Sequence, residues 1–240
     1  KTKAADGIRL GLVGSEMGIK ESKEMVQAWR EAVKPVGLVP TMGALLAGHL
    51  SLVDQARADN CTVAVSIFVN PAQFGDQKDI QGYPRDMEGD LEMLRRHGVD
   101  LVYAPTVDEV YPEGFATWVD VGPLAEKLEG LHRPGHFRGV ATVVSKLFNV
   151  MQPDRAYFGQ KDGQQVVVIQ KLAQDLDMGV DVVVMPTIRE SDGLAMSSRN
   201  VQLSPEQRRA APVVHKTLCQ AYLSWTDGER SGDVLREAAR

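Results

Sequence analysis

The sequence has few cysteines, no excess of basic residues and no long hydrophobic run. Cys61 and Cys219 lie far apart without metal-ligand spacing, which excludes a disulfide-stapled fold and predicts reduced thiols in a cytoplasmic protein. With 27 Lys and Arg against 32 Asp and Glu, the formal net charge is −5, so no overall positive field attracts nucleic acid or an anionic membrane. The longest apolar stretch, Thr62 to Val69, is too short to cross a bilayer, which takes about 20 residues.

The composition is that of a compact globular protein. Of 240 residues, 43% are hydrophobic and 25% are charged, both close to the usual averages. This length predicts one large domain, or a large domain with a small one. The chain begins with Lys1 and ends inside a helical pattern, Ser231 to Arg240, so we expect a fragment of a longer polypeptide.

Strand-like and helix-like segments alternate along the chain. The strand candidates are short, apolar and rich in β-branched residues, at 36–39, 62–69, 99–103, 118–121, 156–158 and 180–185. Apolar residues recur at helical spacing over 85–97, 139–151 and 163–176. This order predicts an α/β fold, with a doubly wound, mostly parallel sheet covered by helices on both faces. Such sheets bind ligands beyond the carboxyl ends of their strands, where the strand order reverses.

A break in the alternation predicts a second domain. Pro186 is followed by a polar segment that ends at Gly193, and we place a domain boundary near there. Beyond it the pattern is helical, with Ser204 as the N-cap and Pro205 as the first helical residue.

The segment from Val39 to Leu52 predicts a phosphate site. A strand ends at Pro40 and a helix begins near Gly48, so free N–H groups and the positive end of the helix dipole face the carboxyl edge of the sheet. His49 in the first helical turn can bridge phosphate oxygens, or it can be a surface or capping histidine. The glycines between Ile8 and Gly18 have the spacing GxxGxxxG, which matches neither a dinucleotide-binding loop nor a P-loop.

Two side-chain amides follow the strand that ends at Val69. Amides donate and accept hydrogen bonds without charge, so Asn70 and Gln73 suit a ligand with hydroxyl and carboxylate groups. Ordinary Asn-Pro turn chemistry explains Asn70 equally well.

The segment from Arg133 to Gly139 carries two guanidinium groups and an imidazole ahead of a long helix. His132 and His136 have the spacing of a metal-binding pair, but Pro134 and Gly135 interrupt the helix that such a pair requires. We therefore expect a binding loop for an anionic group and no metal site.

Two further polar segments bear on phosphate binding. The segment from Gly159 to Gln165 follows a strand and begins a helix; its Lys161 is a phosphate ligand or a solvated charge, and its Asp162 is a site residue or simply an N-cap. The segment from Met196 to Asn200 offers two hydroxyls and a guanidinium for phosphate oxygens, although such a string is also common on surfaces.

Together these segments resemble the pantoate–β-alanine ligases (pantothenate synthetases), a family of the nucleotidyltransferase superfamily named for its HxGH motif. The resemblance runs from about Val36 to Glu206 and includes the strings RPGHFRGVATVVSKLFNVMQPDRAYFGQKD and DGLAMSSRNVQLSPEQR. It implies a Rossmann-like ATP- and pantoate-binding domain at 1–187 and the start of an incomplete C-terminal lid domain at 188–240, in a homodimer. The implied reaction joins pantoate to β-alanine through pantoyl adenylate and releases AMP and pyrophosphate, with Mg²⁺ bound to ATP and not in a dedicated protein cage.

The resemblance also implies roles for individual residues. His49 is the implied proton donor, and Lys161 and Arg199 are the implied catalytic clamps on developing phosphate charge. The implied ATP-binding residues are Met42, Gly43, Ala44, Leu45, Leu46, Ala47, Gly48, His49, Gly159, Gln160, Lys161, Asp162, Ile188, Met196, Ser197, Ser198 and Arg199. The implied residues for pantoate and β-alanine are Gln73, Gln165, Asn70, Tyr83, Arg133 and His136.

One departure from the family motif bears on activity. Leu46 stands where the first His of the motif is expected, and we expect adenylation to be slower by about 10²- to 10³-fold, with ATP binding less affected. Two alternatives follow: a catalytically impaired homologue that binds nucleotide or pantoate, and another adenylyltransferase of the superfamily, such as one acting on phosphopantetheine. Gln73, Gln165 and the 133–136 loop favour pantoate as the substrate.

Overall fold

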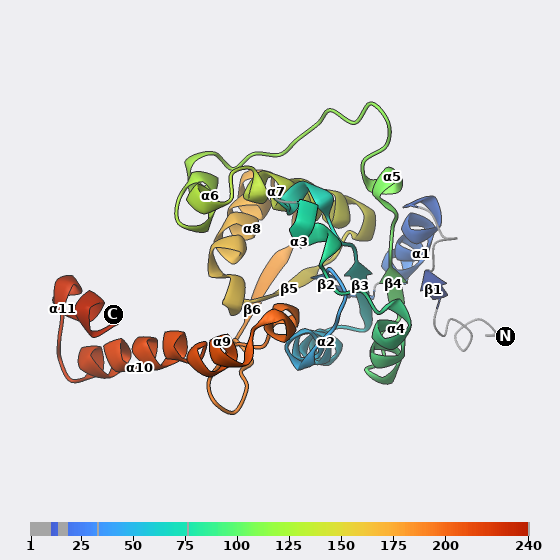
Figure 1. The fold of residues 1–240 in the computed structure, drawn as a ribbon. Helices are drawn as coiled ribbons and strands as arrows, with labels where there is room; N and C mark the ends of the chain where they lie inside the picture. Colours follow the sequence, from blue (N-terminus) through green and yellow to red (C-terminus); the bar gives the residue numbers. More distant parts are fainter. Residues whose placement is uncertain (1–10, 14–18, 33, 76, 240) are drawn as a thin grey trace. The chain divides into compact units, whose positions relative to one another are not determined.

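The structure, a computed structural model, describes residues 11–13, 19–32, 34–75 and 77–239 (Figure 1). The chain divides into two compact units. The first unit comprises Lys1–Leu45 and His49–Pro186, and the second comprises Leu46–Gly48 and Thr187–Arg240. The assignment of residues 1–187 to an ATP-binding domain and of 188–240 to a lid stays a prediction.

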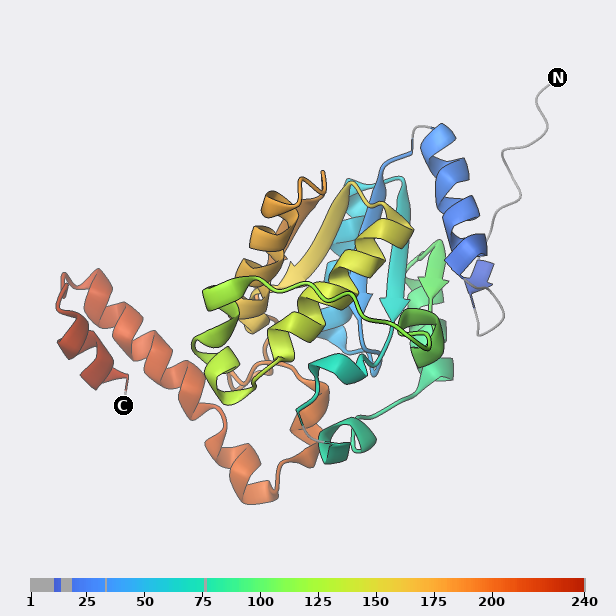
Figure 2. The same ribbon diagram turned by 90° about the horizontal axis from the view of Figure 1, so that it is seen from above.

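The first unit is built on a sheet in which all neighbouring strands of the described chain are parallel (Figure 2). In spatial order the strands are β1 (Gly11–Val13), β4 (Leu101–Tyr103), β3 (Thr62–Ile67), β2 (Val36–Thr41), β5 (Arg155–Gly159) and β6 (Asp181–Met185). The strand order reverses between β2 and β5, so the chain leaves these neighbouring strands toward opposite sides of the sheet. The predicted α/β fold with a parallel sheet is confirmed. Of the segment from Ile8 to Gly18, only β1 lies within the described residues.

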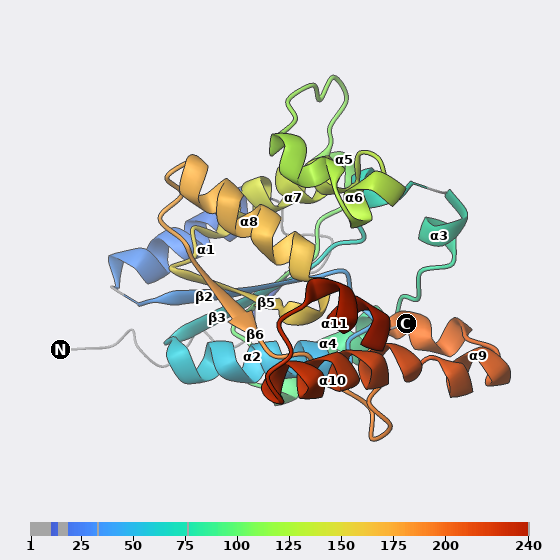
Figure 3. The same ribbon diagram turned by 90° about the vertical axis from the view of Figure 1, so that its left-hand side faces the viewer.

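Successive side chains of the central strands enter two different cores. Leu38 and Ala156 lie in the core shared with α1 (Ile19–Glu31), α7 (His136–Met151) and α8 (Gly163–Asp175). Val39 and Tyr157 lie in the core shared with α2 (Ala47–Asp59) and α4 (Met87–Arg96). The helices therefore cover both faces of the sheet (Figure 3), which explains why these strands are almost continuously apolar.

The predicted long helices are present, with local reasons for their limits. Asp86 accepts a hydrogen bond from the Gly89 N–H and caps α4. Helix α7 begins at His136, three residues before the predicted start at 139, because Gly135 adopts a left-handed conformation (φ 80°) and turns the chain directly into the helix. Helix α8 begins at Gly163, as predicted.

The predicted strand at Trp118–Val121 is wrong. This segment joins no strand in the described chain; the Val119 N–H donates instead to Thr142 Oγ1 on α7, at 3.0 Å. Trp118 stacks on Tyr111, with 5.8 Å between ring centroids. The segment is thus anchored by side chains. The remaining short elements of this unit are η1 (Pro71–Gln73), α3 (Gln77–Gln81), α5 (Val107–Val110), η2 (Gly122–Glu126), α6 (Glu129–His132) and η3 (Gln160–Asp162).

The second unit is mainly helical. An isolated antiparallel bridge joins Arg189 to Ala195, and η4 (Ser198–Gln202), α9 (Pro205–Ala210), α10 (Val213–Thr226) and α11 (Gly232–Ala238) follow. The predicted start of α9 is confirmed, because Ser204 and Gln207 form a reciprocal capping box with Pro205 at the first helical position. Among the described residues, no helix is both long and apolar enough to span a bilayer.

Candidate functional site

The loop between β2 and α2 makes a sharp turn that is held from outside the loop. Gly43 and Ala44 both have positive φ angles, of 80° and 50°. The Gly43 N–H donates to Thr41 Oγ1 at 3.2 Å, while the N–H groups of Ala44 and Leu45 donate to the Asp90 carboxylate at 2.8 and 2.7 Å. Asp90 thus holds the first residues of the predicted phosphate loop.

Asp90 lies on α4 and is only 2% exposed. A Cβ atom at Gly43 would lie 2.9 Å from Asp90 Oδ2 and 3.1 Å from Ile67 Cγ2, so the close fit requires glycine. Burial raises the pKa of the Asp90 carboxyl, and the two backbone hydrogen bonds oppose that rise. Sequence reasoning missed this role of Asp90. The available signal was its position three residues after Met87 and four before Leu94, on the apolar face of the helix.

We expect Asp90→Asn to loosen the phosphate loop. In the wild type both carboxylate oxygens of Asp90 accept from backbone N–H groups, whereas asparagine places its N–H₂ group against one of these donors. The lost hydrogen bond should lower the free energy of unfolding by about 1–3 kcal/mol and raise the KM for ATP. Denaturant unfolding and steady-state kinetics measure both effects. Glu88→Gln, an exposed change on the same helix, is the control and should alter neither. An Asp90→Asn protein with unchanged stability and KM would contradict the role of Asp90.

His49, in the first turn of α2, interacts electrostatically with Lys161, which follows β5. Burial lowers the pKa of His49, the positive charge of Lys161 lowers it further, and the negative charge of Asp162 opposes the shift. His49 is therefore a neutral imidazole near pH 7. Lys161 Nζ lies 2.9 Å from Asp162 Oδ1, while the side chain of Asp162 makes no capping bond to α8. The first turn of α2 and the segment after β5 thus lie within electrostatic range of each other where the strand order reverses. This proximity favours a site role for His49 over a surface histidine.

The side chain of Asn70 links the loop after β3 to α7. Its Oδ1 accepts from the Ala72 N–H at 3.2 Å, the turn-forming bond that an Asn-Pro sequence favours. Its Nδ2 donates to Gln73 Oε1 at 3.0 Å and to the Gly139 carbonyl at 3.1 Å. Gln73 Nε2 then donates to Met42 Sδ at 3.1 Å, which brings the loops after β2 and β3 together.

Arg133 and His136 contact the backbone of Gln73. His136 Nδ1 donates to the Gln73 carbonyl at 2.7 Å, and Arg133 Nη2 donates to the same oxygen at 3.2 Å. Arg133 Nη1 also pairs with Glu129 Oε1 at 2.7 Å. Burial lowers the pKa of His136, so the loop carries less positive charge than its sequence indicates. Direct substrate contacts by Arg133, His136 and the buried Tyr83 stay predictions.

The first turn of α8 carries two glutamines with different surroundings. Gln165 is half-buried, and its contact with pantoate stays a prediction. Gln164 Oε1 accepts from the Glu129 N–H at 2.9 Å, and Gln164 Nε2 donates to the Lys127 carbonyl at 2.7 Å. Gln164 therefore anchors the loop that supplies Glu129 to Arg133. Sequence reasoning missed this residue, although a second amide beside Gln165 was the signal.

The other predicted ATP residues are divided between the two units. Gly159 and Gln160 belong to the first unit, whereas the second contains Leu46, Ala47, Gly48, Ile188, Met196, Ser197, Ser198 and Arg199. A Cβ atom at Gly48 would lie 3.9 Å from Ile188 Cβ, so these two positions are neighbours. The Met196 N–H donates to the Ile188 carbonyl at 3.0 Å, and Ser197 Oγ accepts from the Arg199 N–H at 3.2 Å. That this group and the first unit's loops surround one triphosphate stays a prediction. Among the described residues, no three His, Cys, Asp or Glu side chains are placed to hold a metal ion.

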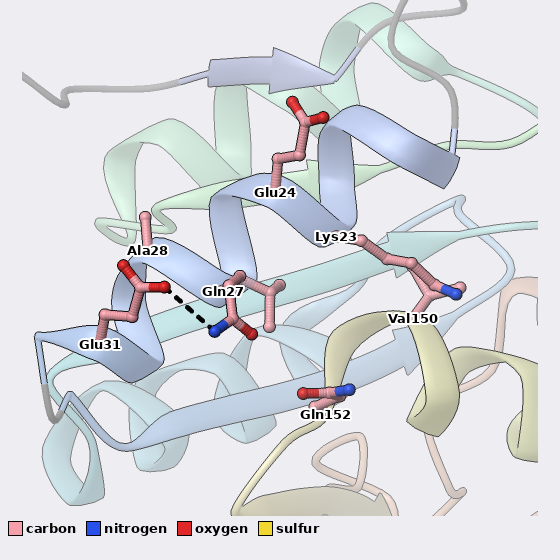
Figure 4. A pocket seen from close by; sticks show the side chains of 8 residues that line it. Lys23, Glu24, Gln27, Ala28, Glu31, Val150 and Gln152 are labelled. Carbon is pink, nitrogen blue, oxygen red and sulfur yellow. Dashed lines mark hydrogen bonds between the residues drawn. The ribbon is translucent and has the colours of Figure 1, made fainter.

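The two described surface pockets lie at the amino ends of the strands. One, of about 460 Å³, is lined by α1 and the end of α7, including Lys23, Gln27 and Gln152 (Figure 4). The other, of about 560 Å³, is lined by the last turns of α8 and by residues at or just before the starts of β5 and β6. Neither pocket contains a residue predicted for the site.

Comparisons with known proteins agree on one family. Residues 17–240 match the family model described as pantoate-beta-alanine ligase. The pantothenate synthetase of Roseiflexus castenholzii is 58% identical over 205 residues, which are 85% of this chain and 74% of that protein. The crystal structure of pantothenate synthetase from Thermus thermophilus has a TM-score of 0.87 and 49% identity, covering 96% of this chain and 80% of that one. The Francisella tularensis pantoate-beta-alanine ligase, complexed with beta-gamma ATP and beta-alanine, has a TM-score of 0.80 and 38% identity over 85% of this chain and 78% of that one.

Proposed function

The chain belongs to the pantoate–β-alanine ligase family, and we propose that it uses ATP to join pantoate to β-alanine. The observation that carries this function is the meeting of three loops at the carboxyl ends of β2, β3 and β5. His49 lies within electrostatic reach of Lys161, and Gln73 reaches Met42. The relatives at 58% and 49% identity are named pantothenate synthetases, which does not favour an impaired homologue. The same family match argues against a phosphopantetheine adenylyltransferase.

The reaction has two displacements. A carboxylate oxygen of pantoate attacks the α-phosphorus of ATP, the bond from that phosphorus to the bridging oxygen breaks, and pyrophosphate leaves. The β-alanine nitrogen then attacks the acyl carbon of pantoyl adenylate, AMP leaves, and the nitrogen loses a proton. Both steps depend mainly on positioning and on charge stabilisation.

We assign the charge stabilisation to three residues. Lys161 and Arg199 offset the negative charge that develops on the transferred phosphoryl group. The neutral imidazole of His49 donates an N–H hydrogen bond to phosphate, because burial and Lys161 keep its pKa low.

Gln73 and Gln165 hold pantoate from facing sides, and Gln73 also lies near the incoming β-alanine.

Three further features belong to this proposal. Asp162 beside Lys161 would offer one carboxylate oxygen to an Mg²⁺ ion bound with ATP, and that ion would supply charge neutralisation at the phosphates. The enzyme is a homodimer, as the family resemblance implies. It works in the cytoplasm, and its two exposed free thiols, Cys61 and Cys219, suit a reducing compartment.

Incubation with pantoate, β-alanine and Mg·ATP tests the function. We expect AMP and pantothenate in equal amounts, and no AMP when pantoate is left out. Finding neither product at high enzyme concentration would defeat the proposal. Transfer of AMP to phosphopantetheine, with pyrophosphate as the second product, would support the other adenylyltransferase activity.

A further inference from the structure

We propose that Tyr111 is a positioning residue for pantoate, because its hydroxyl fixes the orientation of the Gln73 side-chain amide through Asn70. The inference rests on the proposed function and deepens it. Tyr111 directly follows α5 and lies 41 residues beyond Asn70 in the chain, so no sequence motif connects the two. Its O–H group donates to Asn70 Oδ1 at 2.8 Å.

The hydrogen bonds of Asn70 allow only one orientation of its amide. Asn70 is 1% exposed, so its polar atoms depend on protein partners. Its Oδ1 receives two donors, the Tyr111 O–H and the Ala72 N–H, whereas its Nδ2 faces two acceptors, Gln73 Oε1 and the Gly139 carbonyl. A flipped amide would turn its oxygen toward both acceptors and its N–H₂ toward the Ala72 N–H.

This arrangement determines what Gln73 presents to a ligand. Its Oε1 accepts from Asn70, so its Nε2 is the group turned toward Met42 Sδ. A thioether sulfur is a weak acceptor, and a substrate oxygen in its place forms a stronger hydrogen bond. Gln73 thus offers N–H donors, which suit the carboxylate or hydroxyl oxygens of a hydroxy acid such as pantoate.

The backbone of Gln73 is fixed independently of Tyr111. His136 and Arg133 both donate to its carbonyl oxygen. A Cβ atom at Gly139 would lie 2.3 Å from the Ala72 carbonyl oxygen, so α7 packs directly on this loop. The Tyr111 hydroxyl therefore acts on the side-chain amides, together with the Ala72 N–H and the Gly139 carbonyl, and leaves the position of the loop to other contacts.

The Tyr111 ring is held in place without its hydroxyl. Phe115 meets it edge to face at 5.1 Å between centroids, Trp118 stacks on it, and Lys146 Nζ lies 5.9 Å from its centroid. Burial raises the pKa of Tyr111 to about 12, so the hydroxyl remains a donor at neutral pH. Tyr111→Phe should therefore keep the packing and remove only the bond to Asn70.

We expect Tyr111→Phe to raise the KM for pantoate by about 3- to 10-fold, with kcat and the KM for ATP within about 2-fold of the wild type. Calorimetric titration with pantoate should show the same loss of affinity. Tyr157→Phe is the matched control. Its side chain is also buried, and its hydroxyl accepts from Asn60 at 2.7 Å and donates to Asp59 at 2.9 Å. These partners lie at the end of α2, just before β3 begins, and not in the loops that follow the strands. The control should lose thermal stability and keep the wild-type KM for pantoate.

Each outcome decides the inference. An active wild type with an unchanged KM for pantoate in Tyr111→Phe overturns the role of Tyr111 and leaves the proposed function intact. Equal rises in the KM for pantoate in Tyr111→Phe and Tyr157→Phe would indicate a general structural effect. This result would also overturn the positioning role of Tyr111. A wild type that neither binds pantoate nor forms pantothenate defeats both the function and the inference. A rise in the KM for pantoate that is confined to Tyr111→Phe supports the role of Tyr111 in orienting Gln73 through Asn70.

Discussion

The Lys161→Met variant is expected to form pantoyl adenylate about 10²- to 10³-fold more slowly than the wild type. Lys161 follows β5 at the point where the strand order reverses, and it places a positive charge near His49. Methionine keeps a long unbranched side chain but cannot offset charge on the transferred phosphoryl group. Pyrophosphate release with pantoate and Mg·ATP measures this step without β-alanine.

The matched control for this change is Lys171→Met on α8. Lys171 Nζ lies 2.6 Å from Asp175 Oδ1, so this lysine also has a neighbouring carboxylate, and its side chain is half exposed. The control removes one charge and one ion pair away from the loops, and its adenylation rate should stay within about 2-fold of the wild type. Similar losses of adenylation rate in both variants, or an unchanged rate in Lys161→Met, would contradict a catalytic role for Lys161.

The Lys161→Met variant has a second measurable effect, on the titration of His49. The Lys161 charge is one of two causes that lower the pKa of His49, so its removal should raise that pKa, while burial keeps it below the ordinary value. In the wild type the unfolded chain binds a proton at His49 more readily than the folded chain. The stability associated with neutral His49 is therefore present above about pH 6.5 and is lost as the pH falls below it. NMR titration of the His49 ring should show the upward shift, and its absence would contradict the proximity of the two groups.

The sequence predicted the sheet well because burial on both faces leaves a local pattern. Thr62 to Val69 alternates between two cores, so nearly every residue must be apolar, and β3 occupies most of this range. The segment Trp118–Val121 shows the limit of the same reasoning. An extended, partly apolar pattern does not reveal whether another strand is available, and here Thr142 and Tyr111 provide the contacts instead.

The loops of the candidate site were predictable, but the contacts that orient them were not. The alternation of strands and helices is enough to place Met42, Gln73 and Lys161 at one edge of a sheet. The partners that hold these loops come from distant segments: Asp90 binds the amide of Leu45 across 45 residues, and Tyr111 binds Asn70 across 41. Spacing along the chain carries no information about such pairs. Composition was a poor guide at Arg133. Its positive charge favoured a loop that binds an anionic group, but in the structure this charge pairs with Glu129.

Leu46→His is expected to raise the rate of pantoyl adenylate formation by about 10²- to 10³-fold, with a smaller change in the KM for ATP. Leu46 lies three residues before His49, at the first histidine position of the family motif, and its side chain cannot donate a hydrogen bond to phosphate. An imidazole there adds a donor that acts on the charge of the transition state more than on bound ATP. Leu46→Phe is the control, because it supplies a ring without a donor. Equal gains in both variants would assign the effect to the ring, and no gain in Leu46→His would show that Leu46 does not limit the reaction.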